Sequence, residues 1–345
     1  MRAVICGYYG RGNGGDEALL VSLLQMLPSE IKPIVLSNNP RETSQCYGVE
    51  TCPSRDWWQV FQTLKKADIF IWGGGSLMQD VTSFASPIYY GGLMALAQLL
   101  GLKTIAWGQG IGPLNRPFTR WLTKKVLKQC SLVTVRDDVS AHLVADWGIS
   151  PIVAPDPVWA LEAQSVKGLS DLPAPRIAVN LRPHPLLTPA KLDKLTQALI
   201  HLQTSTGAFI LLVPFQKSRD LPLCEAVARQ LRENYQIISL EDPRQLKGLF
   251  RGVEMVIGMR FHSLIMAAAE DCRCFALSYD PKVSRLIAEV PMPGWELDQL
   301  PEAVNDISNT WINFYANGEG LTSDRKHFLI DRALIHREIL SRLVS

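Results

Sequence analysis

Three basic side chains stand close together in the second half of the chain, each just after an apolar run. Arg260 and His262 follow residues 254–258, and Lys282 follows residues 274–279. If the two runs are neighbouring parallel strands, their carboxyl ends lie at one edge of a sheet, where open α/β sheets bind ligands. An arginine and a lysine there would hold an anion. His262 either donates a proton near neutral pH or is bonded to the backbone at a strand end.

The first half of the chain repeats this pattern. Arg136 ends the apolar run 132–135 and is a candidate anion contact, and the alternative is a structural ion pair with Asp137 or Asp138. Asp156 lies between two prolines, which restrict the backbone around its carboxylate. Asp156 therefore either shapes a turn or lines the site.

Glycine-rich loops follow several of the expected strands, at residues 10–16, 73–76 and 108–112. Glycines let the backbone approach a ligand, and amides at a helix N-terminus suit an anion or a sugar hydroxyl. We therefore regard four loop residues as candidate substrate contacts, namely Asn13, Asp16, Gly74 and Ser76. Asp16 either caps or enters the helix that begins there, or it contacts an acceptor hydroxyl.

Alternating short apolar runs and helical patterns must position these residues, and such alternation is typical of βαβ units with a parallel sheet. Expected strands of the first half are 3–8, 33–36, 69–72, 104–107, 132–135 and 152–154. Expected strands of the second half are 176–181, 209–213, 236–240, 255–257 and 274–278. Arg182, His184 and Lys217 follow the first two of these strands, and their side chains could also reach the site.

The predicted fold is α/β, with two Rossmann-like domains facing across a cleft. We assign residues 1–162 to an N-terminal domain on the acceptor side and 176–320 to a C-terminal domain on the donor side. The polar, proline-bearing segment 163–175 is typical of a linker. Residues 321–345 are expected to be helical and could pack back on the first domain.

Composition excludes several classes of function. The chain has 35 basic and 33 acidic residues, so it lacks the excess of positive charge expected for a nucleic-acid partner. Seven scattered cysteines predict neither a zinc site nor disulfides. The acidic pair after residues 10–15 would repel the pyrophosphate of NAD. We therefore expect no metal and no cofactor.

The expected location is the cytoplasm. The chain runs directly into a strand, which leaves no room for a signal peptide. Its most apolar window, residues 91–100, is much shorter than the roughly twenty residues that span a membrane.

The sequence resembles the polysaccharide pyruvyl transferase family in four motifs, at residues 12–17, 72–76, 135–137 and 259–263. Its length, its strand order and the position of Lys282 are most similar to those of the CsaB-type enzymes of that family. The resemblance implies a GT-B-like fold and transfer of pyruvate from phosphoenolpyruvate, as a co-substrate, onto a sugar, giving a ketal and phosphate. It also implies that His262 is the general acid and that Arg136, Arg260 and Lys282 hold the donor. Arg260 could equally hold the shape of its loop.

The acceptor suggested by the resemblance is an N-acetylmannosamine-type or other hexose in a cell-wall or exopolysaccharide precursor, either free or lipid-linked. Asp16 or Asp156 could take the proton from its hydroxyl. For a lipid-linked acceptor at the inner face of the plasma membrane, Trp72, Tyr89 or Tyr90 could touch the sugar or make peripheral membrane contact; the alternative for these rings is core packing.

Two other functions compete with this interpretation. The first is a nucleotide-sugar glycosyltransferase with the same GT-B architecture, because a fold does not determine a function. The second is a carbohydrate-binding protein without catalysis.

Overall fold

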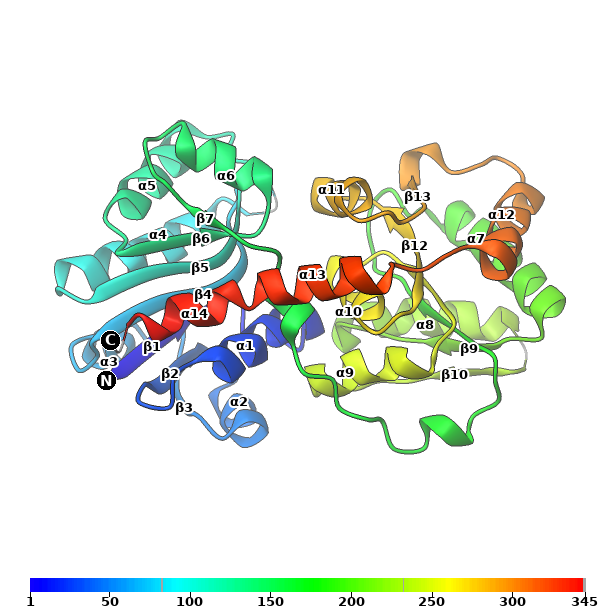
Figure 1. Cartoon of the computed structure of the whole chain (residues 1–345), viewed down its shortest axis with the longest axis horizontal. Helices are drawn as coiled ribbons and strands as arrows, with labels where there is room; N and C mark the ends of the chain where they lie inside the picture. Colours follow the sequence, from blue (N-terminus) through cyan, green and yellow to red (C-terminus); the bar gives the residue numbers. More distant parts are fainter. Residues whose placement is uncertain (82, 232, 344–345) are drawn as a thin grey trace. The chain divides into compact units, whose positions relative to one another are not determined.

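The computed structural model describes residues 1–81, 83–231 and 233–343. The chain divides into two compact units (Figure 1). The first unit consists of Met1–Leu161 with Leu329–Ser345, and the second consists of Glu162–Phe328. Each unit contains a parallel β-sheet with helices around it. The prediction of two Rossmann-like α/β domains is confirmed.

The sheet of the first unit has the strand order β3-β2-β1-β4-β5-β6-β7, and all adjacent strands run parallel. The order reverses between β1 and β4, which makes a switch point there. Residues 3–5 of β1 are fully buried, as expected for a parallel strand covered on both faces. The strands are β1 (Arg2–Cys6), β2 (Lys32–Ser37), β3 (Glu50–Pro53), β4 (Ile69–Met78), β5 (Lys103–Ile111), β6 (Leu132–Val135) and β7 (Ile152–Val153).

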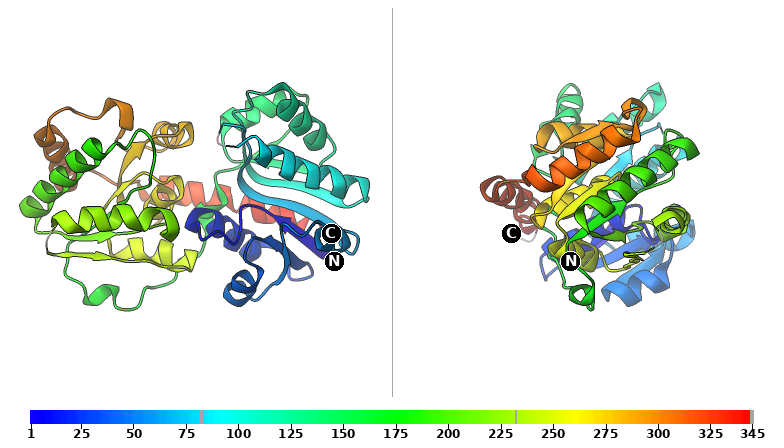
Figure 2. Two further views of the ribbon diagram at one scale, coloured as in Figure 1. Left: turned by 180° about the vertical axis from the view of Figure 1, so that it is seen from behind. Right: turned by 90° about the vertical axis from the view of Figure 1, so that its right-hand side faces the viewer.

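Helices cover both faces of this sheet (Figures 1 and 2). On one face, a hydrophobic core joins the sheet to α3 (Trp57–Leu64), α4 (Ala85–Leu99), α5 (Pro117–Lys128) and α6 (Asp138–Ala145). On the other face, a second core joins it to α1 (Gly14–Met26) and α14 (Ile335–Ser341). Helix α2 (Pro40–Tyr47) connects β2 to β3, and the short 3-10 helix η1 (Pro157–Ala160) follows β7.

The sheet of the second unit has the order β10-β9-β8-β11-β12-β13, again with parallel neighbours. Its switch point lies between β8 and β11. The strands are β8 (Arg176–Asn180), β9 (Phe209–Leu212), β10 (Tyr235–Ile237), β11 (Met255–Gly258), β12 (Arg273–Ser278) and β13 (Gly294–Glu296). The α-helices are α7 (Pro189–Thr206), α8 (Lys217–Leu231), α9 (Pro243–Leu249), α10 (Phe261–Ala269), α11 (Pro281–Glu289) and α12 (Val304–Asn317). Helix α13 (Ser323–Ala333) begins in this unit and ends in the first.

The structure differs from the predicted elements in a few places. Strands β3 and β13 were not predicted, because both are short edge strands and proline lies in or beside each. The single helix predicted within residues 321–345 is instead α13 and α14, which are separated at Leu334. The segment 163–175, for which we predict a linker, belongs to the second unit and contains the 3-10 helix η2 (Leu169–Asp171).

Candidate functional site

Basic residues gather at the carboxyl edge of the second unit's sheet. Arg182 lies two residues beyond β8, and His262 lies in the first turn of α10, directly after β11. Gly258 of β11 pairs with Asn180 of β8, so both residues leave the sheet at its switch point. Lys282 lies in the first turn of α11, after the neighbouring strand β12. The strand order therefore brings these three basic residues to one edge.

The turn that carries His262 is held by a buried asparagine. The carbonyl oxygen of Asn180 accepts a hydrogen bond from the amide of Met259 (2.8 Å), and its side-chain Oδ1 accepts one from the amide of Arg260 (3.3 Å). Its Nδ2 donates to the Val213 carbonyl (2.7 Å). Asn180 thus fixes the β11–α10 turn against β8 and β9. Its position inside an apolar run concealed this role in the sequence.

Arg260 forms a buried ion pair rather than pointing into open space. Its Nε donates to Oδ2 of Asp220 (2.8 Å) and its Nη2 donates to Oδ1 (2.6 Å), and the two side chains are 8% and 0% exposed. Oδ2 of Asp220 also accepts the amides of Phe215 and Gln216. These contacts favour the second expectation for Arg260, which is to hold the shape of its loop.

Arg182 is the residue at this edge that the sequence underrated. Its Nη1 donates to the hydroxyl of Tyr279 (2.6 Å), and its guanidinium lies 4.9 Å from the centre of that ring. Its Nε is buried and has no hydrogen-bond partner among the described residues. Partial burial and the nearby Arg182 charge lower the pKa of His184. The ring of His184 lies 4.8 Å from that of Tyr279, tilted by 48°. The signal in the sequence was the position of Arg182 at a strand end.

Lys282 is more accessible than the arginines. Its Nζ lies 3.6 Å from Oδ2 of Asp280, and the two side chains are about one third exposed. Asp280 also caps α11 by accepting the amide of Lys282 (3.1 Å). His262 is half-buried, and its ring meets the edge of Phe261 at 5.1 Å.

The first unit joins three predicted site residues in one cluster. Arg136 donates from Nη1 to Oδ2 of Asp156 (2.7 Å) and from Nη2 to Oγ of Ser76 (2.9 Å). The Arg136 and Asp156 side chains are 4% and 2% exposed. Arg136 thus forms a buried ion pair with Asp156, a partner that the sequence did not indicate for it. Because Asp156 Oδ1 also accepts the Val158 amide (3.0 Å), Asp156 shapes a turn as well as binding the arginine.

Gly110 makes room for this cluster. A Cβ atom at this position would lie 3.0 Å from Nε and 3.1 Å from Nη2 of Arg136, and 3.1 Å from Oγ of Ser76. The sequence predicts that the glycine loops let the backbone approach a ligand closely. At Gly110 the backbone instead approaches side chains of the protein itself, those of Arg136 and Ser76.

The other candidates surround the switch point between β1 and β4. Asn13 caps α1 by accepting the Gly15 amide (3.2 Å), and its side-chain amide donates to Asp16. Asp16 is partly exposed, and its Oδ1 lies 3.7 Å from the place of a Cβ on Gly75. Gly74, like Gly75, has a positive φ, and a Cβ on Gly74 would meet Leu19 at 2.9 Å. Asp16 therefore enters the helix while remaining accessible.

Glu17 is a buried carboxyl group beside these residues. Burial raises its pKa to about 7, although hydrogen bonds from the amide of Gly10 (2.8 Å) and the hydroxyl of Tyr47 (3.3 Å) oppose the rise. The sequence showed only an acidic first turn, without the burial.

Of the three aromatic residues considered for sugar or membrane contact, Trp72 and Tyr90 are buried and Tyr89 is partly exposed. Trp72 is 0% and Tyr90 is 7% exposed, and both belong to a hydrophobic core. Tyr89 is half-buried and donates its hydroxyl to the Ser54 carbonyl (2.7 Å). For Trp72 and Tyr90 the structure therefore shows the alternative of core packing.

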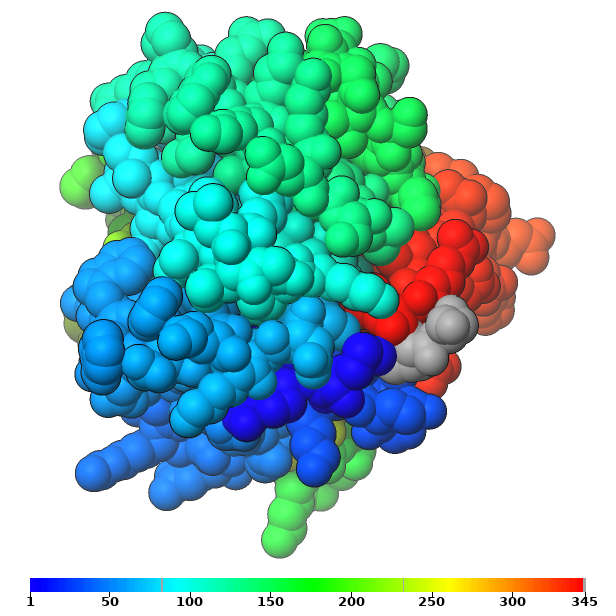
Figure 3. Space-filling view, turned by 90° about the vertical axis from the view of Figure 1, so that its left-hand side faces the viewer, coloured from blue at the N-terminus to red at the C-terminus, as the bar shows by residue number. Residues whose placement is uncertain are grey.

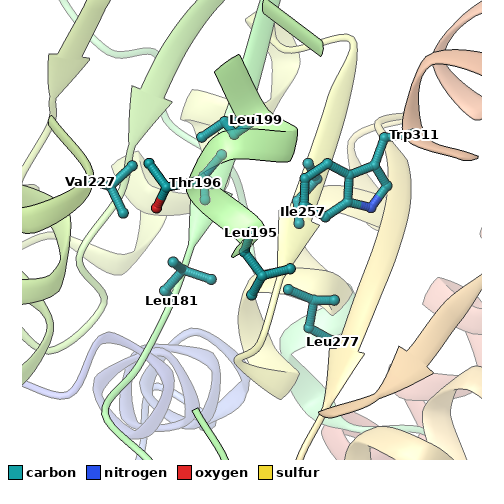
Figure 4. A pocket seen from close by; sticks show the side chains of 9 residues that line it. Leu181, Leu195, Thr196, Leu199, Val227, Ile257, Leu277 and Trp311 are labelled. Atoms are coloured by element: carbon teal, nitrogen blue, oxygen red, sulfur yellow. The ribbon is translucent and has the colours of Figure 1, made fainter. Parts of the chain in front are cut away.

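An apolar pocket inside the second unit is separate from these polar clusters (Figure 4). Side chains from α7, the central strands and Trp311 of α12 line it. Two polar groups lie in its lining: Thr196 donates its hydroxyl to the Leu192 carbonyl of its own helix (2.7 Å), and Nε1 of Trp311 is buried without a hydrogen-bond partner among the described residues. This pocket is a gap in the core and offers no group for catalysis.

Two further observations concern ligands and membranes. The described part of the chain contains no group of three or more His, Cys, Asp or Glu residues able to hold a metal ion. Within the same residues, no helix combines the length and the apolar character needed to cross a membrane.

Solved structures with a similar fold include a UDP-GlcNAc 2-epimerase, a protein in complex with UDP and glucose, and a glycosyltransferase. The chain matches UDP-GlcNAc 2-epimerase from Methanocaldococcus jannaschii with a TM-score of 0.67 at 10% identity, over 99% of this chain and 100% of that one. HepE from Anabaena, in complex with UDP and glucose, gives 0.63 at 10% identity over 100% and 99%. A glycosyltransferase from Rickettsia africae ESF-5 gives 0.61 at 14% identity over 100% and 98%. These similarities show the fold, which is of the GT-B type.

A comparison with curated proteins gave no significant match. The sequence profile of the family described as polysaccharide pyruvyl transferase, however, matches residues 13–281. That range covers more than three quarters of the chain and includes nearly all of the residues described above, in both units. The chain therefore belongs to the polysaccharide pyruvyl transferase family.

Proposed function

We propose that the protein transfers the pyruvyl group of phosphoenolpyruvate to a sugar of a cell-surface polysaccharide precursor, forming a pyruvate ketal and releasing phosphate. Membership of the family supports pyruvyl transfer. One observation supports this donor above all: Arg182, His262 and Lys282 follow the adjacent strands β8, β11 and β12. Phosphoenolpyruvate carries a carboxylate and a phosphate, and guanidinium and ammonium groups complement both.

Each basic residue has a distinct role in the proposal. Arg182 holds one anionic group of the donor through the buried Nε that has no partner among the described residues. Lys282, which is partly exposed beside Asp280, neutralises the other. Arg260 keeps the β11–α10 turn in place through Asp220 and so positions His262.

His262 acts as the general acid. Its imidazolium gives a proton to the methylene carbon of the donor, so that the carbon bearing the phosphate gains oxocarbenium character. One sugar hydroxyl adds to that carbon, and a second hydroxyl of the same sugar then displaces phosphate. Of the two hydroxyl protons, one restores His262, and the other is taken up by a base and passes from it to the departing phosphate. General acid catalysis of this kind is worth about 10²–10⁴-fold in rate.

The first unit supplies the acceptor side in this proposal. Asp16 is the better candidate for the base, because it is partly exposed at the carboxyl edge of the sheet. Asp156 is 3% exposed, and both of its carboxylate oxygens accept hydrogen bonds within the protein. Arg136 is hydrogen-bonded to Asp156 and Ser76. Its binding to the donor remains a prediction.

The test is to incubate the protein with phosphoenolpyruvate and a panel of hexose acceptors, free and lipid-linked, and to measure phosphate together with the mass of the product. A gain of one pyruvyl ketal with one phosphate per turnover is expected. His262→Ala should abolish both, while His201→Ala, which changes an exposed histidine of α7, should leave them unchanged. Wild-type turnover by the His262 variant would refute the role of His262.

The competing function is a glycosyltransferase that uses a nucleotide sugar. The similarity to HepE in complex with UDP and glucose favours it, although at 10% identity only the fold is shared. Calorimetry separates the two proposals, because ours requires binding of phosphoenolpyruvate and the competing one requires binding of a nucleoside diphosphate. Tight binding of UDP with no binding of phosphoenolpyruvate would reverse our choice.

A further inference from the structure

Helix α4 presents an unusual surface to water. Its sequence, residues 85–99, contains no charged side chain. Its exposed positions, Ala85, Ile88, Gly92 and Leu99, recur at helical spacing and are all apolar, and Leu99 is 85% exposed. Phe84, just before the helix, is 41% exposed. A surface helix ordinarily turns charged or polar residues to solvent. The solvent-facing side of α4 instead carries apolar residues.

Helix α5 lies beside α4 and supplies cations and further rings. Gln98 of α4 donates to the Val126 carbonyl of α5 (2.8 Å), which joins the two helices. Phe118 and Trp121 of α5 are 50% and 53% exposed, and their rings stack at 5.8 Å. The exposed side of α5 thus combines large apolar rings with the basic residues of the same helix.

Cations and rings alternate across the two helices. The guanidinium of Arg116 lies 4.5 Å from the ring centre of Phe84, and Nζ of Lys125 lies 5.1 Å from that of Trp121. Arg120 and Lys128 are also exposed on α5. The apolar surface continues on the other side of α4, where Trp57 of α3 meets Tyr89 at 5.6 Å. Figure 3 shows part of this side of the first unit, where segments of α3 (blue), α4 (cyan) and α5 (blue-green) adjoin.

The charge of the chain is divided unevenly in the same region. Residues 81–136 contain seven basic side chains and not one acidic side chain. The rest of the chain has 28 basic and 33 acidic residues, and is therefore net acidic. A formal charge of +2 for the whole chain hides this positive segment, from which both α4 and α5 are formed.

We propose that the outward faces of α4 and α5 dock on the surface of an anionic phospholipid bilayer. We call this surface the α4–α5 face, and it consists of Phe84, Ile88, Leu99, Arg116, Phe118, Arg120, Trp121, Lys125 and Lys128. The rings and aliphatic side chains enter the headgroup region, where aromatic residues are favoured. The basic residues bind anionic headgroups while their stems cover apolar surface.

The chemistry of the face selects this partner over a nucleic acid. Lipid headgroups and nucleic-acid backbones both present phosphates, but Ile88 and Leu99 on the uncharged helix α4 would find an apolar partner only in acyl chains. Helix α4 has 15 residues, too few to cross a bilayer, so it lies on the membrane surface. The inference does not rest on the proposed function, because none of these residues belongs to the proposed site.

The test is flotation of the full chain with vesicles of phosphatidylcholine alone or mixed with phosphatidylglycerol. The wild-type protein should bind the anionic vesicles at least tenfold more tightly than the neutral ones, and raised salt should weaken binding. Arg120→Glu with Lys125→Glu should reduce binding to anionic vesicles at least tenfold. Phe118→Ser with Trp121→Ser should abolish the binding that persists at high salt. The matched control, Arg229→Glu with Arg337→Glu, reverses two exposed charges elsewhere and should bind as the wild type does.

Several outcomes would overturn the proposal. One is equal affinity of wild-type protein for neutral and anionic vesicles, or no binding to either at low salt, and this measurement needs no variant. Another is equal loss of binding in the control variant. A third is displacement from vesicles by RNA together with unchanged binding of the Phe118 and Trp121 variant, which would assign the face to a nucleic acid. Circular dichroism of each variant confirms that it remains folded.

Discussion

Arg260 and Asp220 are joined by two short hydrogen bonds, Nε to Oδ2 at 2.8 Å and Nη2 to Oδ1 at 2.6 Å, across 40 residues of sequence. The pair ties the β11–α10 turn to the loop before α8, whose amides at Phe215 and Gln216 bind the same carboxylate. A charged pair at a strand end can thus support the turn that carries His262 rather than make a ligand contact.

Asp220→Asn should therefore destabilise the protein strongly. It leaves the guanidinium of Arg260 buried without its counter-charge, which costs about 3–5 kcal/mol in comparable cases. Urea unfolding measures the loss. The control is Glu302→Gln, which breaks the surface ion pair with Lys194 and should leave stability unchanged. Equal stability of the Asp220 variant and wild type would show that the pair contributes little.

Arg182→Lys should impair donor binding while keeping the positive charge. Lysine cannot reproduce the fork that reaches Tyr279 and leaves Nε for an anion. We expect the KM for phosphoenolpyruvate to rise about tenfold, equivalent to about 1.4 kcal/mol, with a smaller change in kcat. Steady-state kinetics with varied donor provide the measurement. Tyr279→Phe keeps the ring and removes only the hydroxyl, and it should have a milder effect; an unchanged KM in Arg182→Lys would remove Arg182 from the donor site.

Gly110→Ala should disturb activity more than stability. The new Cβ would lie 3.0 Å from Nε of Arg136, whose guanidinium is held by Asp156, so Arg136 must move away from Ser76. We expect kcat/KM to fall at least tenfold. Gly92→Ala is the control, since a Cβ there meets nothing within 4 Å and an exposed helical alanine stabilises by roughly 0.4–1 kcal/mol. Normal kinetics in Gly110→Ala would mean that the cluster tolerates displacement.

Glu17→Gln should change how stability depends on pH. The pKa of Glu17 is raised by burial from 4.5 to about 7, so the folded state retains a proton that the unfolded state has lost. Its contribution to stability is complete below about pH 4.5 and is lost as the pH rises to about 7, at a cost of about 3 kcal/mol at most. A glutamine stays neutral and can still accept the Gly10 amide.

The measurement is the free energy of unfolding of both proteins at pH 5 and pH 8. Relative to wild type, the Glu17→Gln variant should be more stable at pH 8 than at pH 5. An identical difference at both pH values would show that Glu17 ionises normally in the folded state.

The amino-acid sequence alone determined the fold class and the positions where functional residues leave the sheets. Hydrophobic periodicity and glycine loops are local features, so the alternation of strands and helices could be read without knowing their neighbours. His262, Arg260 and Lys282 were placed correctly at strand ends by this pattern. Edge strands β3 and β13 escaped it, because each is short and has a proline in it or beside it.

Only the tertiary structure decided what each of these side chains contacts. The partner of an arginine depends on which strands become neighbours. Spacing could therefore show neither the pairing of Arg136 with Asp156 nor that Arg182 Nε has no partner among the described residues. Burial is likewise decided by what packs on each element, which is why Trp72 of the central strand β4 is fully buried while Trp121 of α5 is 53% exposed. The sequence thus determined where charge and apolar surface occur along the chain, and the packing of the sheets determined which of them remains available to a ligand.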